Sequence, residues 1–146
     1  MKRVPAVDVR DYGSADEAAV LALWRDCRLL HPLNDPARDI EFCRASGHGA
    51  LFVGEEAGQV VATVMVGHDG HRGWLYYVAV APDRQRRGLG RRLVDHAEGW
   101  LKARGVPKSQ LMIRDTNAGV RAFYERLGYV AEPRVVMARR FTDKPS

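Results

Sequence analysis

Cysteine, long apolar runs and repeated segments are scarce or absent in this sequence of 146 residues. Cys27 and Cys43 are the only cysteines, which excludes the disulfide framework of a small secreted domain and leads us to expect a cytoplasmic protein. No apolar run reaches the ~18 residues that a membrane-spanning helix needs, and no hydrophobic signal segment follows Met1, so no membrane partner is expected. Because repeats, low-complexity tracts and long linkers are also lacking, we expect residues 1–146 to form one domain.

The chain is basic, with a formal net charge of +5 and a pI near 9.6. A basic chain makes nucleic acid a partner to weigh. Six arginines, however, fall between Arg72 and Arg92. One polyanionic small molecule explains such a local cluster better than an extended nucleic acid does, and we expect no nucleic-acid partner.

The most informative stretch runs over residues 75–105. It opens with an apolar strand at 76–80, which Pro82 ends because proline has no N–H for ladder pairing. After a polar turn with two glycines, apolar residues recur at helical spacing, at Leu89, Leu93, Ala97 and Leu101. A strand, a glycine-containing loop and a helix in this order indicate an anion site, because the first N–H groups of a helix lack internal partners and the helix dipole is positive there.

The residues of the loop narrow the kind of anion site. A Walker loop needs Lys-Ser/Thr after its last glycine, where this chain has Arg91-Arg92. A dinucleotide loop needs a third glycine, where this chain has Leu93. Neither nucleotide motif is present.

Turn residues and apolar periodicity predict the other elements. The N-terminal half has a strand at 7–10, a helix that starts at a capping box of Ser14 and Glu17, a helix over 36–45, and a hairpin of 51–55 and 59–66. The C-terminal half adds a strand at 110–114, a helix with Asn117 as its N-cap, and a final strand at 135–141. This order predicts an α/β fold with a mixed sheet, antiparallel in its N-terminal part and parallel across the central helix.

Two segments resemble the GNAT (GCN-five-related) N-acetyltransferases. Residues 85–90, Gln-Arg-Arg-Gly-Leu-Gly, resemble the (Q/R)-x-x-G-x-(G/A) loop of that family, and residues 117–129 resemble its N…Y-(E/R)-(K/R)-x-G-F segment. Residues 34–36, 69–73 and 76–77 resemble the small bacterial YpeA-like acetyltransferases within the family. The resemblance implies one GNAT domain of about six to seven strands and about four helices, with a splayed central strand pair.

The resemblance also implies acetyl-CoA as co-substrate, with pantetheine in the splayed gap and the pyrophosphate on the loop. A strand bulge near Val78 and Ala79 would open the gap. The cofactor-binding residues carried over are Val78, Ala79, Val80, Gln85, Arg86, Arg87, Gly88, Leu89, Gly90, Arg91 and Asn117. Asn117 is also explained by its capping role alone.

The resemblance implies transfer of an acetyl group to a primary amine by direct attack in a ternary complex, and the lack of a cysteine placed for a covalent intermediate agrees with that. Tyr124 is the candidate general acid for the departing sulfur, although its spacing on the helix also fits a core aromatic. The glutamate that many members carry on the central strand corresponds to Trp74 here, which cannot accept a proton. Asp69 and His71, or water, remain the candidate bases.

Fewer sequence features indicate which residues bind the acceptor than which bind acetyl-CoA. Trp24, His31, Asn34, Asp35 and Tyr76 are the candidate acceptor-binding residues, since the resemblance puts the first helix and the following break at the acceptor rim. Tyr76 and Tyr77 are expected to face opposite ways, because side chains alternate along a strand. His68 and His71 lack further ligands at suitable spacing, so no metal is expected.

A small-molecule or peptide amine is the expected acceptor, and the protein is expected to be a monomer or a homodimer. The competing hypotheses are a CoA-binding regulatory module without catalysis, which the missing strand glutamate leaves open, and a nucleic-acid-binding domain, which only the net charge supports.

Overall fold

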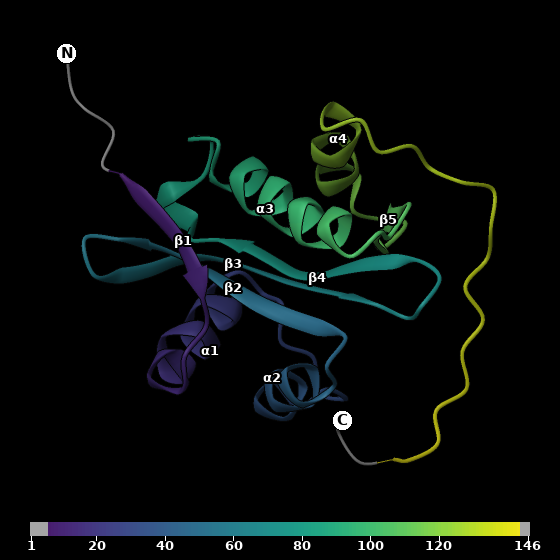
Figure 1. The fold of residues 1–146 in the computed structure, drawn as a ribbon, viewed down its shortest axis with the longest axis horizontal. Coiled ribbons are helices and arrows are strands. Elements are labelled where there is room, and N and C mark those ends of the chain that lie inside the picture. The colour runs from purple at the N-terminus through teal and green to yellow at the C-terminus, as the bar shows by residue number, and fades with distance from the viewer. Residues whose placement is uncertain (1–5, 144–146) are drawn as a thin grey trace.

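The computed structural model describes residues 6–143, which form a five-stranded sheet between two layers of helices (Figure 1). The strands are β1 (Val7–Asp11), β2 (Gly49–Glu56), β3 (Gln59–His68), β4 (Gly73–Val80) and β5 (Ser109–Gln110). The helices are α1 (Glu17–Asp26), α2 (Pro36–Ala45), α3 (Leu89–Ala103) and α4 (Ala118–Arg126), with 3-10 turns η1 (Ser14–Asp16) and η2 (Pro82–Arg84). Helices α1 and α2 cover one face of the sheet and α3 and α4 the other, as expected for a mixed α/β fold.

The strands follow chain order across the sheet. The first four pair antiparallel, and β4 pairs with β5 in parallel. Helix α3 makes the crossover that a parallel pair requires, as the sequence predicts. Strand β5 is therefore the last strand of the sheet, and its outer side is a sheet edge.

Each face of the sheet buries the apolar stripe of the helices that cover it. The α3 side buries Leu93, Val94, Ala97 and Leu101 against Val64, Val66 and Leu75. The α1 and α2 side buries Val20, Leu23, Trp24 and Ile40 against Leu51, Val53, Met65 and Ala79. Within residues 6–143, none of the helices has the length and apolar character needed to cross a membrane.

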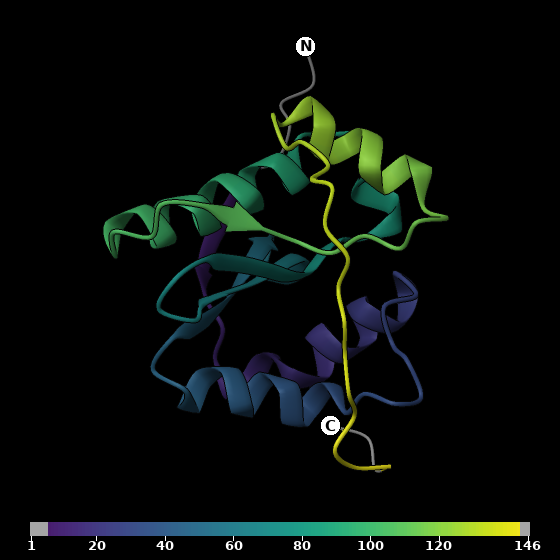
Figure 2. The ribbon, with the colours of Figure 1, turned by 90° about the vertical axis from the view of Figure 1, so that its right-hand side faces the viewer.

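The sheet has fewer strands than the six to seven predicted. The strand predicted at 110–114 is limited to the two residues of β5. The strand predicted at 135–141 is wrong, because residues 130–143 lie outside any helix or strand and are exposed. This segment passes the β5 end of the molecule as an extended arm and crosses the direction of the strands (Figures 1 and 2). It is called the C-terminal arm below.

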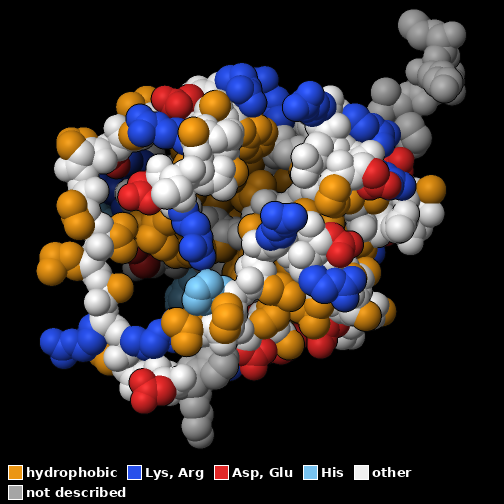
Figure 3. All heavy atoms as spheres, turned by 180° about the vertical axis from the view of Figure 1, so that it is seen from behind, with side chains coloured by type: hydrophobic (Ala, Val, Ile, Leu, Met, Phe, Trp, Pro, Cys, Tyr) orange, Lys and Arg blue, Asp and Glu red, His pale blue; other side chains and the backbone are white. Residues whose placement is uncertain are grey.

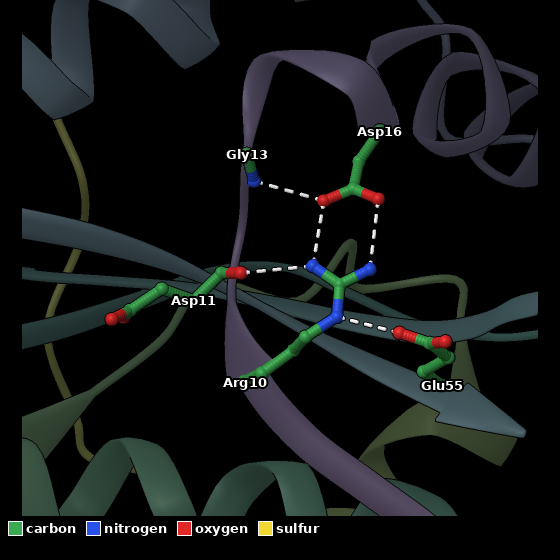
Figure 4. Close-up of polar contacts among 5 residues, drawn as sticks. All are labelled: Arg10, Asp11, Gly13, Asp16 and Glu55. Atoms are coloured by element: carbon green, nitrogen blue, oxygen red, sulfur yellow. Dashed lines mark hydrogen bonds and ion pairs between the residues drawn. The ribbon is translucent and has the colours of Figure 1, made fainter. Parts of the chain in front are cut away.

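An arginine fastens the start of α1 to the first two strands (Figure 4). Arg10 of β1 donates from Nη1 and Nη2 to the two carboxylate oxygens of Asp16, at 2.8 and 2.9 Å. Its Nε donates to Glu55 of β2 at 2.6 Å. One guanidinium thus joins three segments, and this bidentate pairing lowers the pKa of Asp16.

The start of the first helix differs from the capping box predicted at Ser14 and Glu17. Ser14 begins the turn η1, and its side chain caps neither η1 nor α1. Asp16 accepts the Gly13 N–H at 2.8 Å instead. Asp16, held by Arg10, therefore accepts the N–H of the N-cap residue, which is the part that the capping-box pattern assigned to Glu17.

Asp16→Asn is expected to lower the free energy of unfolding by about 1–2 kcal/mol at pH 7, because it weakens two charge-assisted hydrogen bonds. The folded-state pKa of Asp16 lies below its ordinary value. Its stabilisation is therefore present above the unfolded-state pKa and is lost as pH falls through the folded-state pKa. Urea unfolding at pH 7 and pH 3 should show a difference from wild type that shrinks in acid.

The matched control is Asp26→Asn. Asp26 pairs with Arg25 at 3.5 Å, with side chains 56% and 69% exposed, so the expected change at pH 7 is under about 0.5 kcal/mol. Equal effects of the two substitutions would show that the Arg10 network adds nothing beyond a surface ion pair.

Candidate active site

The loop predicted to bind an anion lies between β4 and the first turn of α3. Gly88 is the residue before α3 and has φ +79°, a left-handed conformation that favours glycine. An added Cβ at Gly88 would meet no atom within 4 Å, so the space before the helix is open. The 15-residue helix α3 starts at the next residue, and the first N–H groups of a helix lack internal partners and attract anions.

Two other loop residues are fixed by packing. Leu89 is buried beside Val7 and Val61, so its side chain is unavailable and only its backbone can face a ligand. A Cβ at Gly90 would lie 3.0 Å from the Phe123 ring, so glycine lets α3 and α4 approach closely. Gly90 thus has a structural role that accounts for it without a ligand.

The arginines of the loop divide into two groups. Arg87 lies 3.4 Å from Glu56, and Arg84 lies 3.7 Å from the same buried carboxylate. Within residues 6–143, Arg86 and Arg91 make no ion pair, and both are exposed. These two are therefore the arginines most available to an incoming phosphate, while Arg84 and Arg87 hold the loop to β2. Gln85 also holds the loop, since its Nε2 donates to the Val80 carbonyl at 3.3 Å.

Strands β4 and β5 separate soon after they meet, as expected for a splayed pair (Figure 2). They pair only at Gly73 with Ser109 and at Trp74 with Gln110. The part of β4 that contains Val78, Ala79 and Val80 therefore has no ladder partner from β5.

The strand bulge expected near Val78 is present. Between Thr63 and Met65 of β3, the register with β4 moves from Ala79 to Tyr76, which inserts one extra residue in β4. Tyr77 has φ +51° there, an unusual conformation for an aromatic residue. The bulge reorients the backbone beside the splayed gap.

Side chains from three elements hold the bulge. Thr63 of β3 donates its hydroxyl to the Tyr77 carbonyl at 2.8 Å and accepts from Trp24 Nε1 of α1 at 2.9 Å. The Trp24 and Tyr77 rings stack, with centroids 3.8 Å apart. The Tyr77 hydroxyl donates to Asp39 of α2 at 2.8 Å. Thr63, Trp24 and Asp39 are called the bulge clamp below.

The bulge clamp corrects two sequence predictions. Trp24 is fully buried, so it supports the bulge from beneath and is no rim residue for an acceptor. Tyr76 and Tyr77 do not face opposite ways. Tyr76 pairs with Met65 of the α1-side core, and Tyr77 packs in that same core. The extra residue of the bulge breaks the alternation, so both tyrosines lie on the face covered by α1 and α2, where Tyr76 is 44% exposed.

Tyr124 of α4 combines a buried ring with an accessible hydroxyl. The residue is only 6% exposed and packs beside Phe123 and Tyr129. Within residues 6–143 its hydroxyl forms no hydrogen bond, yet that oxygen is not fully enclosed, so it reaches accessible space. Burial raises the pKa of Tyr124 to about 12. Its hydroxyl is thus protonated at neutral pH and free to donate.

Helix α4 holds Tyr124 between the loop and β5. Phe123 lies against Gly90 on one side. On the other, the Tyr129 hydroxyl donates to Glu98 at 2.7 Å and shares a hydrogen bond with Ser109 of β5 at 2.9 Å. Asn117 caps the helix as predicted, since its Oδ1 accepts from Val120 N–H at 3.2 Å. That cap leaves the Asn117 amide NH₂ for another partner.

The candidate bases lie in the β3–β4 hairpin. Asp69 Oδ1 accepts the N–H groups of Arg72 and His71 at 2.7 and 2.9 Å, and Oδ2 accepts from Trp74 Nε1 at 3.3 Å. These bonds, that of Arg72 above all, lower the pKa of Asp69 and weaken it as a base. Because a strand rises about 3.3 Å per residue, the hairpin end of β4 is roughly 13 Å from the bulge at Tyr77.

The remaining rim candidates lie between α1 and α2. His31 and Asn34 are exposed, and His31 Nδ1 accepts from the Leu33 N–H at 3.2 Å. Asp35 caps α2 by accepting the Arg38 N–H at 3.1 Å. These contacts shape the loop, while the imidazole of His31 and the side chain of Asn34 stay exposed.

Sequence reasoning missed three residues that shape this site. The sequence does single out Thr63, because it is the only residue with a hydroxyl group in the apolar run 60–66 of β3. Nothing in the sequence distinguishes Asp39 and Glu56 from other carboxylates. Only the fold brings Asp39 to Tyr77 and Glu56 to the arginines of the loop. Within residues 6–143, no group of three or more His, Cys, Asp or Glu side chains is arranged to hold a metal.

Comparison with known proteins gives concordant matches. The model of the acetyltransferase (GNAT) family matches residues 17–129. The chain is 38% identical over 134 residues to acetyltransferase YE1169 of Yersinia enterocolitica, covering 92% of this chain and 95% of that one. It is 40% identical over 131 residues to acetyltransferase SG1711 of Sodalis glossinidius, covering 90% and 92%.

Solved structures share the fold. Aminoglycoside N-acetyltransferase AAC(6')-Iy in complex with CoA has a TM-score of 0.81 at 17% identity, with 97% of this chain and 99% of that chain covered. Glucosamine-6-phosphate N-acetyltransferase from Arabidopsis thaliana has a TM-score of 0.72 at 21% identity, with 94% and 99% covered. At these identities the likeness is one of fold.

Proposed function

Since this chain belongs to the acetyltransferase (GNAT) family, we propose that it transfers the acetyl group of acetyl-CoA to a primary amine of a small-molecule or peptide acceptor. The proposal rests on the way three features occur together. They are the glycine-preceded N-terminus of α3, the bulge of β4 beside the gap between β4 and β5, and the Tyr124 hydroxyl, which has no hydrogen-bond partner within residues 6–143. The free and partly buried thiols of Cys27 and Cys43 support a cytoplasmic location.

The donor side is formed by the loop and β4. Backbone N–H groups from Gln85 to Arg91 bind the pyrophosphate, and the exposed Arg86 and Arg91 add charge-assisted hydrogen bonds. The backbone of β4 from Val78 to Val80, which β5 leaves unpaired, binds pantetheine. The Asn117 amide, whose oxygen is used by the cap, adds a donor from α4.

The chemistry requires one bond to form and one to break. The neutral amine attacks the thioester carbonyl carbon in a ternary complex, the C–N bond forms, and the C–S bond breaks. Tyr124 donates its proton to the departing sulfur and recovers one from solvent afterwards. We propose water as the immediate acceptor of the amine proton, because Asp69 and His71 lie at the far end of β4 and the pKa of Asp69 is lowered.

The test is thermal unfolding with and without acetyl-CoA, followed by thiol release against a panel of amines. A ligand at 100 times its dissociation constant adds about 2.7 kcal/mol to stability, which shifts Tm by several degrees for a chain of this size. Gly88→Trp should abolish the shift by filling the open space before α3. Gly105→Trp, at φ +74° with open space after α3, imposes similar strain and should keep it.

Each outcome decides a different part of the proposal. No shift in the wild-type protein would overturn the donor site. A shift without thiol release for any amine would favour the regulatory CoA-binding module over the enzyme. A shift lost equally in both tryptophan variants would mean that general destabilisation, rather than the loop, explains the loss.

A further inference from the structure

Asp39 uses only one of its two carboxylate oxygens in the bulge clamp. It lies in the first turn of α2, where its Oδ2 accepts the Tyr77 hydroxyl at 2.8 Å. Within residues 6–143, its Oδ1 accepts no hydrogen bond and the carboxylate forms no ion pair. That oxygen is also not fully enclosed, so it reaches accessible space. One oxygen of a half-buried carboxylate is therefore open to a ligand.

The charge of Asp39 has no counter-ion in the part of the chain that the structure describes. Burial raises the pKa of this carboxyl group, and the hydrogen bond from Tyr77 opposes that rise. The Tyr77 hydroxyl stays neutral, since burial and its bond to Asp39 raise its own pKa. Arg38 is exposed and does not pair with Asp39, while Asp35, the N-cap of α2, adds a second negative charge. Because a partly desolvated charge without a partner is costly, this carboxylate favours a cationic ligand.

Asp39 lies one tyrosine side chain away from the bulge of β4. Tyr77 provides the bulged backbone, and the next residue, Val78, belongs to the backbone proposed to bind pantetheine. The donor loop leads into α3 on one face of the sheet, whereas α2 covers the other face (Figure 1). An acceptor that approaches the thioester from the α1 and α2 side therefore passes Asp39.

Apolar side chains are exposed on the same side of the molecule. Phe42, one helical turn beyond Asp39 on α2, is 71% exposed. Leu33 of the α1–α2 loop and Tyr76 of β4 are exposed as well. The C-terminal arm ends at this loop, where Arg140 Nη1 donates to the Leu33 carbonyl at 3.4 Å, and an opening remains between the arm and the body (Figures 2 and 3). Since methylene groups pack on apolar side chains and cations are attracted to aromatic rings, these surroundings suit an alkyl chain that ends in a positive charge.

We propose that Asp39 binds the second positive charge of a diamine acceptor while the other amine attacks acetyl-CoA beside the bulge. The ammonium group donates a charge-assisted hydrogen bond to Oδ1, the oxygen that Tyr77 leaves free. The two nitrogens of the acceptor are then separated by about the length of the Tyr77 side chain, which requires several methylene groups between them. This role of Asp39 rests on the proposed acetyl transfer, whose bond-forming and bond-breaking steps stay the same.

The test compares cadaverine with pentylamine, which has the same carbon chain and only one amine. For the wild-type protein, kcat/KM measured by thiol release should be about 10–100-fold higher with cadaverine, the effect of one hydrogen bond to a charged group. Asp39→Asn keeps an oxygen that can accept the Tyr77 hydroxyl but removes the charge, so this preference should fall at least about tenfold. Because each preference compares two amines in one protein, a general loss caused by a disturbed bulge cancels.

Two further variants separate the charge of Asp39 from its other effects. Tyr77→Phe removes the hydroxyl and leaves the carboxylate, so the preference for cadaverine should persist even if both rates fall. Asp95→Asn makes the same change of charge at an exposed position of α3, on the other face of the sheet, and should also keep the preference. Loss of the preference in Asp95→Asn would mean that net charge, rather than Asp39, attracts the diamine, and it would overturn the proposal.

The remaining outcomes distinguish the acceptor site from the donor site. An equal fall for both amines in Asp39→Asn would overturn the proposal, because support of the bulge or transfer of the amine proton serves every acceptor alike. A wild-type protein without the preference would overturn it too. If neither amine releases thiol, cadaverine should still raise the Tm of the CoA complex in the wild type and not in Asp39→Asn, and failure here would contradict the role of Asp39. Absence of a Tm shift with acetyl-CoA alone would instead overturn the donor site, and the diamine acceptor with it.

Discussion

Tyr124→Phe is expected to lower kcat by about 10²–10⁴-fold, because the sulfur would then leave without a positioned proton donor. The hydroxyl forms no hydrogen bond within residues 6–143 and reaches accessible space, so its removal should hardly change the free energy of unfolding. Since burial raises the pKa of Tyr124 to about 12, this acid stays protonated across the assay range. The wild-type rate should therefore not decline through its titration between pH 7 and 9. Thiol release at saturating acetyl-CoA, with unfolding in urea, measures both effects.

Tyr129→Phe is the matched control on the same helix end. The Tyr129 hydroxyl is bonded to Glu98 and Ser109, so its loss should lower the free energy of unfolding by about 1–2 kcal/mol with only a several-fold change in kcat. If Tyr124→Phe keeps the wild-type kcat, Tyr124 is not the general acid, and it serves only as a core aromatic, which its helical spacing also allows.

The elements whose formation depends on local chemistry were predictable from sequence. Helix α2 starts at Pro36, a position where proline fits, and spans the predicted residues. Helix α3 starts at Leu89 after Gly88, and its buried stripe has the predicted spacing. The Asn117 cap was predictable because its side chain bonds a neighbour in sequence. The anion loop was predictable from its glycines between a strand and a helix, whereas the splayed pair was predicted only from the family resemblance.

The errors concern features that depend on distant segments. The side-chain alternation that separated Tyr76 from Tyr77 fails because a bulge adds one residue opposite β3. Trp24 was expected at the acceptor rim because the family resemblance puts the first helix there, but its indole N–H donates to Thr63, 39 residues away in the sequence, and its ring is buried. The strand predicted at 135–141 has the right composition, yet a strand also needs pairing with another strand, and residues 130–143 pair with none in the described structure.

The bulge clamp leads to the second large effect, which is expected for Thr63→Val. Valine has nearly the shape of threonine but lacks the hydroxyl, so Trp24 Nε1–H and the Tyr77 carbonyl both lose a buried partner. Leaving two such groups unpaired costs about 2–4 kcal/mol of unfolding free energy. The bulge would also relax from its left-handed conformation at Tyr77, and kcat/KM for acetyl-CoA should fall about 10–100-fold through misplacement of the strand backbone.

Thr63→Ser separates the hydroxyl from the packing. Serine keeps both hydrogen bonds and removes one methyl group from a fully buried site, so a loss of about 1 kcal/mol in stability and a nearly wild-type kcat/KM are expected. Tyr77→Phe tests the Asp39 part of the bulge clamp, because it removes only the hydrogen bond from Tyr77 to Asp39. Urea unfolding and steady-state kinetics on the three variants distinguish the possibilities. If Thr63→Val loses stability but keeps kcat/KM, the clamp supports the core and the bulge does not position the donor. If kcat/KM falls in Thr63→Val and not in Thr63→Ser, the buried Thr63 hydroxyl, which bonds Trp24 of α1 and Tyr77 of β4, holds the β4 backbone in the position that the reaction needs.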